Sequence, residues 1–189
     1  MKTLIVCVSE HHGNTKKIAD AMAAVLDAEV SHPDNVNVEA LSDYDLIGLG
    51  SGIAFGKHYQ RLLEFVDALP ALHAKTFVFS TRGASRGGSH HAALKSKLEE
   101  KGLTVVGEFS CRGFDTYGPM KLIGGIAKGR PNEQDLRDAQ KFAESLQKKL
   151  TTDAEDLSVA AFLATSPARH GESPSWVMIA RDRKRDRGT

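Results

Sequence analysis

The sequence predicts an α/β fold in which a doubly wound, five-stranded parallel sheet carries helices on both faces. Short, solidly apolar runs alternate with longer stretches of helical periodicity from residue 2 to residue 150. This alternation is typical of parallel sheets that are buried on both sides. Most of the links between the apolar runs are also long enough to be crossovers, which parallel neighbouring strands require.

The five predicted strands are the apolar runs themselves. The first, third and fourth runs are apolar enough to be buried on both faces. In chain order the runs are Leu4–Val8, Val36–Val38, Asp45–Leu49, Thr76–Phe79 and Leu103–Val106.

Four stretches between and after these runs place their apolar residues on a single helical face. The second stretch ends at Pro70 and the third at Gly102, whereas the fourth begins after Pro131 with Asn132 as its expected N-cap. The apolar positions are Ile18, Met22, Val25 and Leu26, then Tyr59, Leu62, Leu63, Val66 and Leu69, then Leu94 and Leu98, and finally Leu136, Ala139, Ala143, Leu146 and Leu150.

Composition changes near residue 150, which divides the chain into a domain of residues 1–150 and an extension of residues 151–189. The extension lacks clean periodicity, contains two Ser-Pro pairs and balances its positive and negative charges. We therefore expect it to be largely disordered. The alternative is a docked tail, with residues 157–163 as a short helix and residues 176–179 as an apolar anchor.

Charge and cysteine content narrow the function classes. The 189 residues include 25 Lys and Arg against 24 Asp and Glu, a formal charge of +1, so no global field favours nucleic acid as a partner. The two cysteines, Cys7 and Cys111, form neither a disulfide framework nor a metal-binding spacing. The opening apolar run is too short for a signal peptide, and no apolar window is long enough to span a membrane. We expect a soluble cytoplasmic protein.

The loop after the first strand has the residues of a phosphate cradle. It reads Ser9-Glu10-His11-His12-Gly13-Asn14-Thr15, which places two hydroxyls, a flexible glycine and an amide side chain at a helix N-terminus. Free backbone N–H groups and the helix dipole favour a dianion there. An ordinary capped turn would explain Asn14 or Thr15, but not the whole polar loop.

This loop resembles the flavodoxin family, whose first loop reads roughly T/S-x-T-x-x-N-T and holds the phosphate of FMN. The Gly-Asn-Thr ending matches, while His11 stands where the family often has a second hydroxyl. The resemblance covers residues 1 to about 150 and implies a flavodoxin-like sheet of strand order 2-1-3-4-5. It also implies FMN as the cofactor, with Ser9, His11, Gly13, Asn14 and Thr15 around its phosphate.

Other proteins of similar architecture are excluded by particular residues. A low-molecular-weight phosphatase needs an arginine where Gly13 stands, and a receiver domain needs an aspartate where the third strand instead leads into Gly50 and Ser51. A P-loop needs one residue fewer between Gly50 and Gly56, and a hydroxyl after Lys57.

Two further glycine-rich loops match the family's flavin-facing loops. The resemblance places the loop after the third strand beside the flavin ring, with Ser51, Gly52, Ile53 and Phe55 as cofactor-binding residues and Ile53, Phe55 or Tyr59 as the packing side chain. The loop after the fourth strand would hydrogen-bond the pyrimidine edge through Ser80, Thr81, Arg82 and Gly83. The alternatives are that Phe55 and Tyr59 belong to the core and that the second of these loops is a solvated turn.

A long connection after the fifth strand contains Phe114 and Tyr117, which could gate the site, and Lys121, Lys128 and Arg130, which could meet an anionic partner. Connections of this length are uncommon unless they are functional. The adjacent histidine pairs His11-His12 and His90-His91 do not indicate a metal site, because adjacent side chains rarely point to one ion.

The sequence therefore predicts an FMN-binding protein that acts in electron transfer, with no residue serving as an acid or base. Its partners would be redox proteins or a small-molecule electron acceptor. One alternative is an FMN-dependent NAD(P)H:quinone-type oxidoreductase, and another is a non-redox binding module that keeps the fold without the cofactor. The oligomeric state is not predicted.

Overall fold

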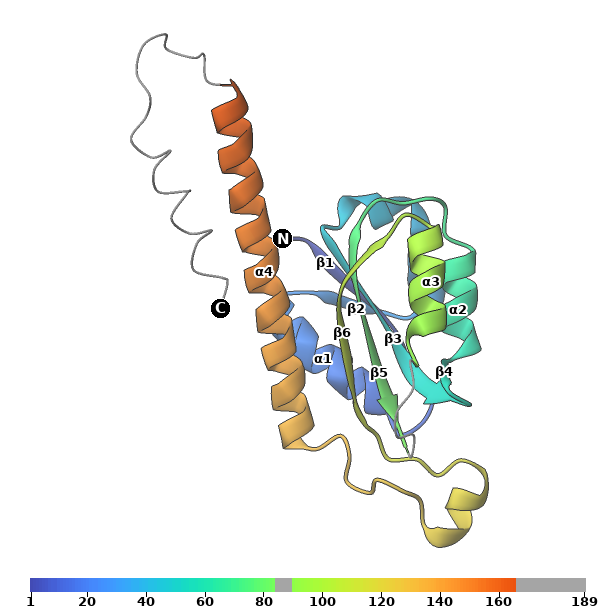
Figure 1. Ribbon diagram of the computed structural model, residues 1–189. Coiled ribbons are helices and arrows are strands. Elements are labelled where there is room, and N and C mark those ends of the chain that lie inside the picture. Colours follow the sequence, from blue (N-terminus) through green and yellow to red (C-terminus); the bar gives the residue numbers. More distant parts are fainter. Residues whose placement is uncertain (84–89, 166–189) are drawn as a thin grey trace, which may run out of the picture. The chain divides into compact units, whose positions relative to one another are not determined.

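The computed structural model describes residues 1–83 and 90–165 (Figure 1). Contacts divide the chain into a unit Met1–Leu150 and a second unit that begins at Thr151. The first unit holds the whole sheet.

The sheet has the strand order β2-β1-β3-β5-β6, and these five strands are all parallel. A short strand, β4, pairs antiparallel with the end of β3. The parallel order is the one expected from the sequence, so the doubly wound fold is confirmed. The strands are β1 (Thr3–Val8), β2 (Glu29–Ser31), β3 (Leu46–Ala54), β4 (Lys57–His58), β5 (Lys75–Arg82) and β6 (Thr104–Arg112).

Helices cover both faces of this sheet, as Figure 1 shows. Helix α1 (Asn14–Leu26) and the first part of α4 (Glu133–Thr165) pack on one face, where Ile18, Met22 and Ala143 join one buried cluster. Helices α2 (Gln60–Asp67) and α3 (Ala92–Glu100) pack on the other face. The apolar stripes predicted for these helices are the faces that they bury.

Glycines in the central strand make room for aromatic rings from its neighbour β5. A Cβ atom at Gly48 would lie 2.3 Å from the Phe77 ring, and one at Gly50 would lie 2.3 Å from the Phe79 ring. Both rings are fully buried. The missing side chains of β3 thus let large rings fill the layer beneath α1 and α4.

The prediction of a second strand at Val36–Val38 is wrong. The strand lies earlier, at Glu29–Ser31, where it pairs with β1 over three residues from Leu4↔Glu29 to Val6↔Ser31. Val36 instead follows the 3-10 helix η1 (Pro33–Asn35), and Val38 begins η2 (Val38–Asp43). Their half-buried side chains pack against the core without joining the sheet, which explains the misleading apolar signal.

Three of the other strands continue beyond the predicted runs. β3 extends through Ala54 and then turns back into β4, so the expected loop after the third strand is a β-hairpin. The two turn residues, Phe55 and Gly56, have φ of 51° and 78°. Positive φ at both central residues is the geometry of the tight turn that best fits the twist of a hairpin.

Helix α4 begins as predicted and continues past residue 150 to Thr165. Asn132 Oδ1 accepts a hydrogen bond from the Asp135 N–H at 3.1 Å, and Asp135 Oδ2 accepts one from the Asn132 N–H at 2.8 Å. This reciprocal pair closes the helix N-terminus. The first part of the expected disordered extension is therefore helical, and residues 166–189, including the proposed anchor at 176–179, lie outside the described residues. Within residues 1–83 and 90–165, no helix is both long enough and apolar enough to cross a membrane.

Candidate functional site

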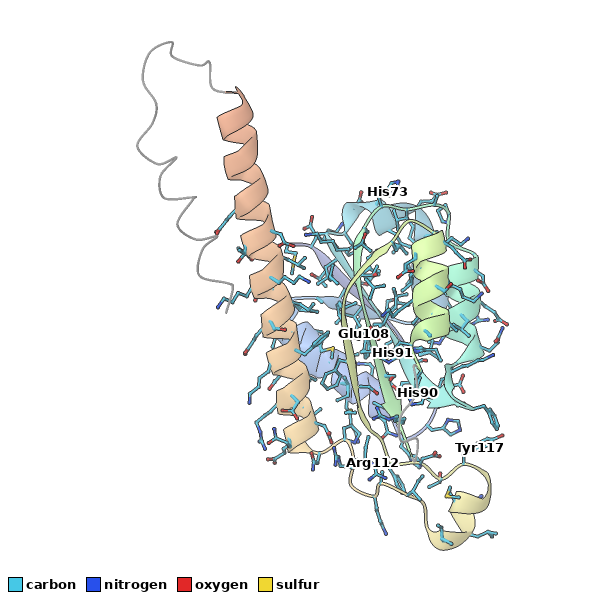
Figure 2. The ribbon with its side chains drawn as sticks, viewed as in Figure 1. His73, His90, His91, Glu108, Arg112 and Tyr117 are labelled. Carbon is cyan, nitrogen blue, oxygen red and sulfur yellow. The ribbon has the colours of Figure 1, made fainter. Side chains whose placement is uncertain are left out.

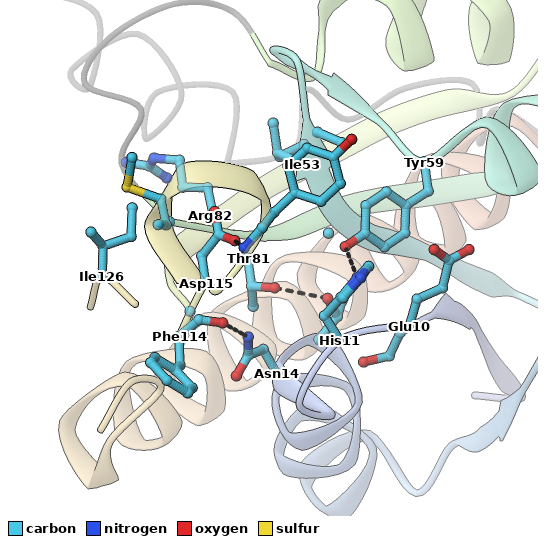
Figure 3. A pocket seen from close by; sticks show the side chains of 18 of the residues that line it. Glu10, His11, Asn14, Ile53, Tyr59, Thr81, Arg82, Phe114, Asp115 and Ile126 are labelled. Atoms are coloured by element: carbon cyan, nitrogen blue, oxygen red, sulfur yellow. Dashed lines mark hydrogen bonds between the residues drawn. The ribbon is translucent and has the colours of Figure 1, made fainter. Parts of the chain in front are cut away.

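A cavity of about 600 Å³ opens at the carboxyl ends of the parallel strands. In open α/β sheets, ligands bind at the carboxyl ends of the strands, at the point where the strand order reverses. In this sheet the order reverses between β1 and β3. Figure 3 shows side chains from four segments around the cavity. The segments are the loop after β1, the end of β3 with its hairpin, the end of β5, and the long connection after β6.

The loop after β1 supplies one wall. Ser9 and His11 line the cavity, and Ser9 Oγ accepts a hydrogen bond from the Lys16 N–H at 3.2 Å. Gly13 precedes the first residue of α1 with φ of 67°, and the space beside its Cα atom is open. It stands next to the cavity rather than among the lining residues. N–H groups at a helix N-terminus suit an anion, and in this structure the Asn14 N–H donates to the His11 carbonyl at 3.4 Å while the Lys16 N–H is held by Ser9 Oγ.

Asn14 and Thr15 join this loop to the rest of the site. Asn14 Nδ2 donates a 2.7 Å hydrogen bond to the Phe114 carbonyl, and Thr15 Oγ1 lies 2.8 Å from Thr81 Oγ1. The Asn14 Oδ1 atom is buried and has no hydrogen-bond partner among the described residues. A buried acceptor left open in this way fits a ligand that brings a hydroxyl or N–H donor into the cavity.

The hairpin of β3 and β4 forms the apolar wall. Gly52, Ile53, Phe55 and Tyr59 all line the cavity. A Cβ atom at Gly52 would lie 2.5 Å from the Tyr59 ring, so the glycine allows that ring to lie against the strand. Tyr59 Oη is 3.2 Å from His11 Nδ1. Burial, together with the negative charges of Glu10 and Asp115, raises the pKa of Tyr59, so its hydroxyl stays protonated.

The third wall combines the end of β5 with the long connection. Thr81, Arg82 and Gly83 line the cavity, and Asp115 packs over Gly83. The Arg82 carbonyl accepts from the Gly113 N–H at 2.8 Å. Asp115 also exchanges backbone hydrogen bonds of 3.0 and 2.8 Å with Ile126, which holds the connection as a closed loop.

Two predicted cofactor residues, Ser51 and Ser80, are fully buried and do not line the cavity. Ser51 Oγ lies 2.8 Å from His58 Nδ1, and Ser80 Oγ lies 2.8 Å from His91 Nε2. β3 and β5 both continue past these serines, and strand alternation points their side chains away from the ligand side. The two serines instead anchor a buried histidine network.

The network reaches the surface through Glu108. His91 Nδ1 lies 3.0 Å from Glu108 Oε2 (Figure 2). Lys95 forms an ion pair with the same carboxylate. The rings of His58 and His91 are 5.1 Å apart. Burial and the neighbouring imidazoles of His91 and His90 lower the pKa of His58 to about 3. Burial also lowers the pKa of His91, although Glu108 acts in the opposite direction. Both imidazoles are thus neutral at physiological pH.

Sequence reasoning singled out Phe114 and Tyr117 in the long connection, and both line the cavity. It did not assign six other lining residues to the site: Glu10, Ala54, Gly113, Asp115, Met120 and Ile126. The sequence feature that pointed to most of these residues was the unusual length of the connection after β6. That length indicated a functional segment but not which of its side chains point into the cavity.

The fold and the cavity together define an α/β protein whose ligand site is built by loops at the switch point of a doubly wound sheet. The sequence matches the model of the Flavodoxin domain over residues 5–118. The chain therefore belongs to the flavodoxin family.

Relatives in sequence include an uncharacterized protein of Methanocaldococcus jannaschii, 45% identical over 149 residues that cover 78% of this chain and 99% of the relative. The flavodoxin-like domain-containing protein BilS of Clostridioides difficile is 29% identical over 72% of this chain and 80% of its own length. An NAD(P)H dehydrogenase (quinone) of a Bradyrhizobium species is 27% identical over 54% of this chain and 61% of its own length.

Solved structures agree on the fold. A flavodoxin from the domain Archaea superposes with a TM-score of 0.59 at 20% identity, covering 80% of this chain and 99% of that one. An oxidised flavodoxin of Bacillus cereus gives a TM-score of 0.60 at 22% identity, covering 79% of this chain and 99% of that one.

Proposed function

We propose that this protein binds FMN in the cavity at the switch point and transfers electrons. The observation that carries the proposal is the division of the cavity into two chemically different parts. One part is the polar loop Ser9–Thr15 at the N-terminus of α1, and the other is an apolar wall made by Ile53, Phe55 and Tyr59. A phosphate at a helix N-terminus and a flat aromatic ring against apolar side chains suit these two parts.

Residues on each side of the cavity would hold the cofactor. The loop Ser9–Thr15 would bind the phosphate through backbone N–H groups and hydroxyls, and the open Asn14 Oδ1 would accept from a hydroxyl of the ribityl chain. The bound flavin would supply the electron-carrying chemistry, whereas the protein would orient it and limit its contact with water. Thr81, Arg82 and Gly83 would face its polar edge.

The first experiment is the visible absorption spectrum of the purified full chain, followed by titration of the apo-protein with FMN and with riboflavin. FMN should bind at least about tenfold more tightly, because charge-assisted hydrogen bonds to its phosphate each contribute about 1.5–3 kcal/mol. An Asn14→Ala, Thr15→Ala double variant should bind both flavins more weakly, through loss of the Asn14 contact to the ribityl chain, and should lose part of the preference for FMN, through loss of the Thr15 hydroxyl. Ser96→Ala, on the exposed face of α3, should keep both the affinity and the preference.

Circular dichroism of each variant separates loss of binding from loss of the fold. If the folded, unchanged protein binds neither flavin, the proposal fails and a non-redox binding module becomes the better interpretation. If riboflavin binds as well as FMN, the loop after β1 is not a phosphate site.

A second candidate function is an FMN-dependent NAD(P)H:quinone oxidoreductase. It is favoured by the relatives named NAD(P)H dehydrogenase (quinone), of which the alignments cover 61% to 72%. Steady-state oxidation of NADH and NADPH in the presence of a quinone distinguishes the two functions. Turnover that depends on bound FMN would favour the enzyme, and FMN binding without turnover would favour the electron carrier. In either case we propose a cytoplasmic location.

A further inference from the structure

Exposed apolar side chains gather beside the mouth of the cavity. Leu122 and Ile123, on the 3-10 helix η3 (Gly118–Ile123), are 89% and 70% exposed, and Phe55, at the hairpin tip, is 88% exposed. Tyr117, 61% exposed, joins the two segments, because its ring lies edge-on to the Phe55 ring at 5.8 Å. Figure 2 shows Tyr117 at the same end of the molecule as η3. We call these four residues the apolar rim.

The backbone conformation of Phe55 supports the interpretation that this surface contacts another molecule. Its φ of 51° lies in the left-handed region, which a bulky L-residue occupies only at a cost in conformational energy. Asparagine or glycine would fit the same turn without that cost. A strained, solvent-exposed phenylalanine does not stabilise the folded chain by burial, so its side chain fits a contact with another molecule.

Three lysines are close neighbours of the rim residues in the chain. Lys57 follows the hairpin tip, and Lys121 and Lys128 lie on either side of Leu122 and Ile123 in the chain. All three lysines are exposed, and none forms an ion pair with another described residue. From Tyr117 to Lys128 the sequence contains two lysines and no acidic residue. The acidic cavity residue Asp115 is half-buried, and one of its oxygens accepts from the Tyr117 N–H at 2.8 Å.

We propose that the apolar rim and its three lysines dock an acidic electron-transfer protein, an inference that rests on the proposed electron transfer. An apolar patch bordered by charge is typical of protein interfaces, and opposite charge on the partner would steer its approach. A second copy of this chain fits less well, because symmetric docking would bring like-charged lysines together. The partner would sit next to the cavity, since Tyr117 and Phe55 belong to both the rim and the cavity wall.

The test uses the full chain loaded with FMN and a reduced two-iron ferredoxin with a strongly acidic surface as the probe. Each ferredoxin gives up one electron, which the loaded protein takes up, and stopped-flow absorbance follows the transfer. The second-order rate should fall at least about tenfold from low to high salt, as expected for electrostatic steering. In a second experiment the loaded protein is first reduced with dithionite and then gives one electron to each basic mitochondrial cytochrome c, and the rate of this transfer should not fall with salt.

Three variants locate the surface. The Lys121→Glu, Lys128→Glu variant should lower the rate with ferredoxin at low salt by about tenfold. The control is the Lys141→Glu, Lys149→Glu variant, which makes the same charge change at exposed positions of α4. It should change the rate by less than about twofold. Leu122→Ser with Ile123→Ser should lower the rate about fivefold at high salt, where apolar contact dominates. None of these residues lines the cavity, so FMN affinity should be unchanged.

Binding of the apo-chain to immobilised ferredoxin keeps this test separate from that of the proposed function. Loss of that binding in the Lys121→Glu, Lys128→Glu variant supports the docking surface even if FMN does not bind. Equal rates and equal binding for the rim variants and the α4 variants would overturn the inference. The inference would also be overturned if the rate with cytochrome c fell with salt while the rate with ferredoxin did not. A dimer of this chain that dissociates in the Leu122→Ser, Ile123→Ser variant would overturn it as well.

Discussion

The buried imidazole of His58 should make the stability of this protein depend on pH in a window where most proteins change little. Burial, together with His91 and His90, lowers the pKa of His58 from 6.5 to about 3. Below pH 6.5 the unfolded chain therefore binds a proton that the folded chain excludes. Stability is highest above that pH and decreases as the pH falls.

The magnitude follows from these two pKa values. Between neutral pH and pH 5, the difference between 6.5 and about 3 corresponds to a loss of about 2 kcal/mol in the free energy of unfolding. His91, whose pKa is also lowered, acts in the same direction. Glu108 acts outside this window: burial opposes its ionisation, but its hydrogen bonds to Lys95 and His91 outweigh burial and lower its pKa below 4.5. Its contribution is lost only at more acidic pH.

The assay is urea unfolding of the apo-protein, followed by far-ultraviolet circular dichroism at several pH values. A His58→Gln variant should lose about 2 kcal/mol less than the unchanged protein between neutral pH and pH 5. Ser51→Ala is the matched control, because it removes the 2.8 Å hydrogen bond to His58 but keeps the buried imidazole. It should be less stable at every pH with the original slope. Equal slopes for the unchanged protein and His58→Gln would refute the reasoning.

Four further predictions concern single features of the fold. Phe55→Asn should raise the free energy of unfolding by about 1 kcal/mol, since asparagine tolerates the left-handed backbone at the hairpin tip; no gain in urea unfolding would contradict this. Gly50→Ala should lower it by about 1–3 kcal/mol, because the new Cβ atom meets the Phe79 ring at 2.3 Å, and thermal unfolding measures the loss. Asn132→Ala should lower the free energy of unfolding by about 1 kcal/mol, because it removes the N-cap of α4. Urea unfolding would detect this loss, and an unchanged midpoint would mean that the cap does not stabilise the protein. Burial raises the pKa of the Cys7 and Cys111 thiols to about 12. Both thiols should therefore react with a thiol reagent at pH 8 only after denaturant is added. Fast reaction of the native protein would contradict their burial.

The sequence predicted four of the five parallel strands because those four contain solid apolar runs, whereas the order of the strands in the sheet was implied by the resemblance to the flavodoxin family. β2 carried no such signal, since it is three residues long and its middle residue Val30 is the only strongly apolar one. An edge strand pairs on one side only, so its sequence needs little apolar character. Val36 and Val38 gave a stronger apolar signal from outside the sheet.

For the site, the sequence indicated the loops but not the directions of their side chains. Thr81 and Ser80 are neighbours, yet only Thr81 lines the cavity. That outcome depends on how far β5 continues and on the alternation of its side chains, which is fixed by pairing with β6 through Arg82↔Arg112. Asp115 and Ile126 were not identified, because their hydrogen bonds to each other close a loop that has no local periodicity.

The glycines opposite aromatic rings also constrain how this sequence can change over evolutionary time. Gly48, Gly50 and Gly52 each leave a space that Phe77, Phe79 or Tyr59 fills. A side chain at any of these positions requires a smaller residue at its partner, so the two positions of a pair should vary together among relatives. At these three glycines a larger side chain is therefore tolerated best when the aromatic partner becomes smaller at the same time.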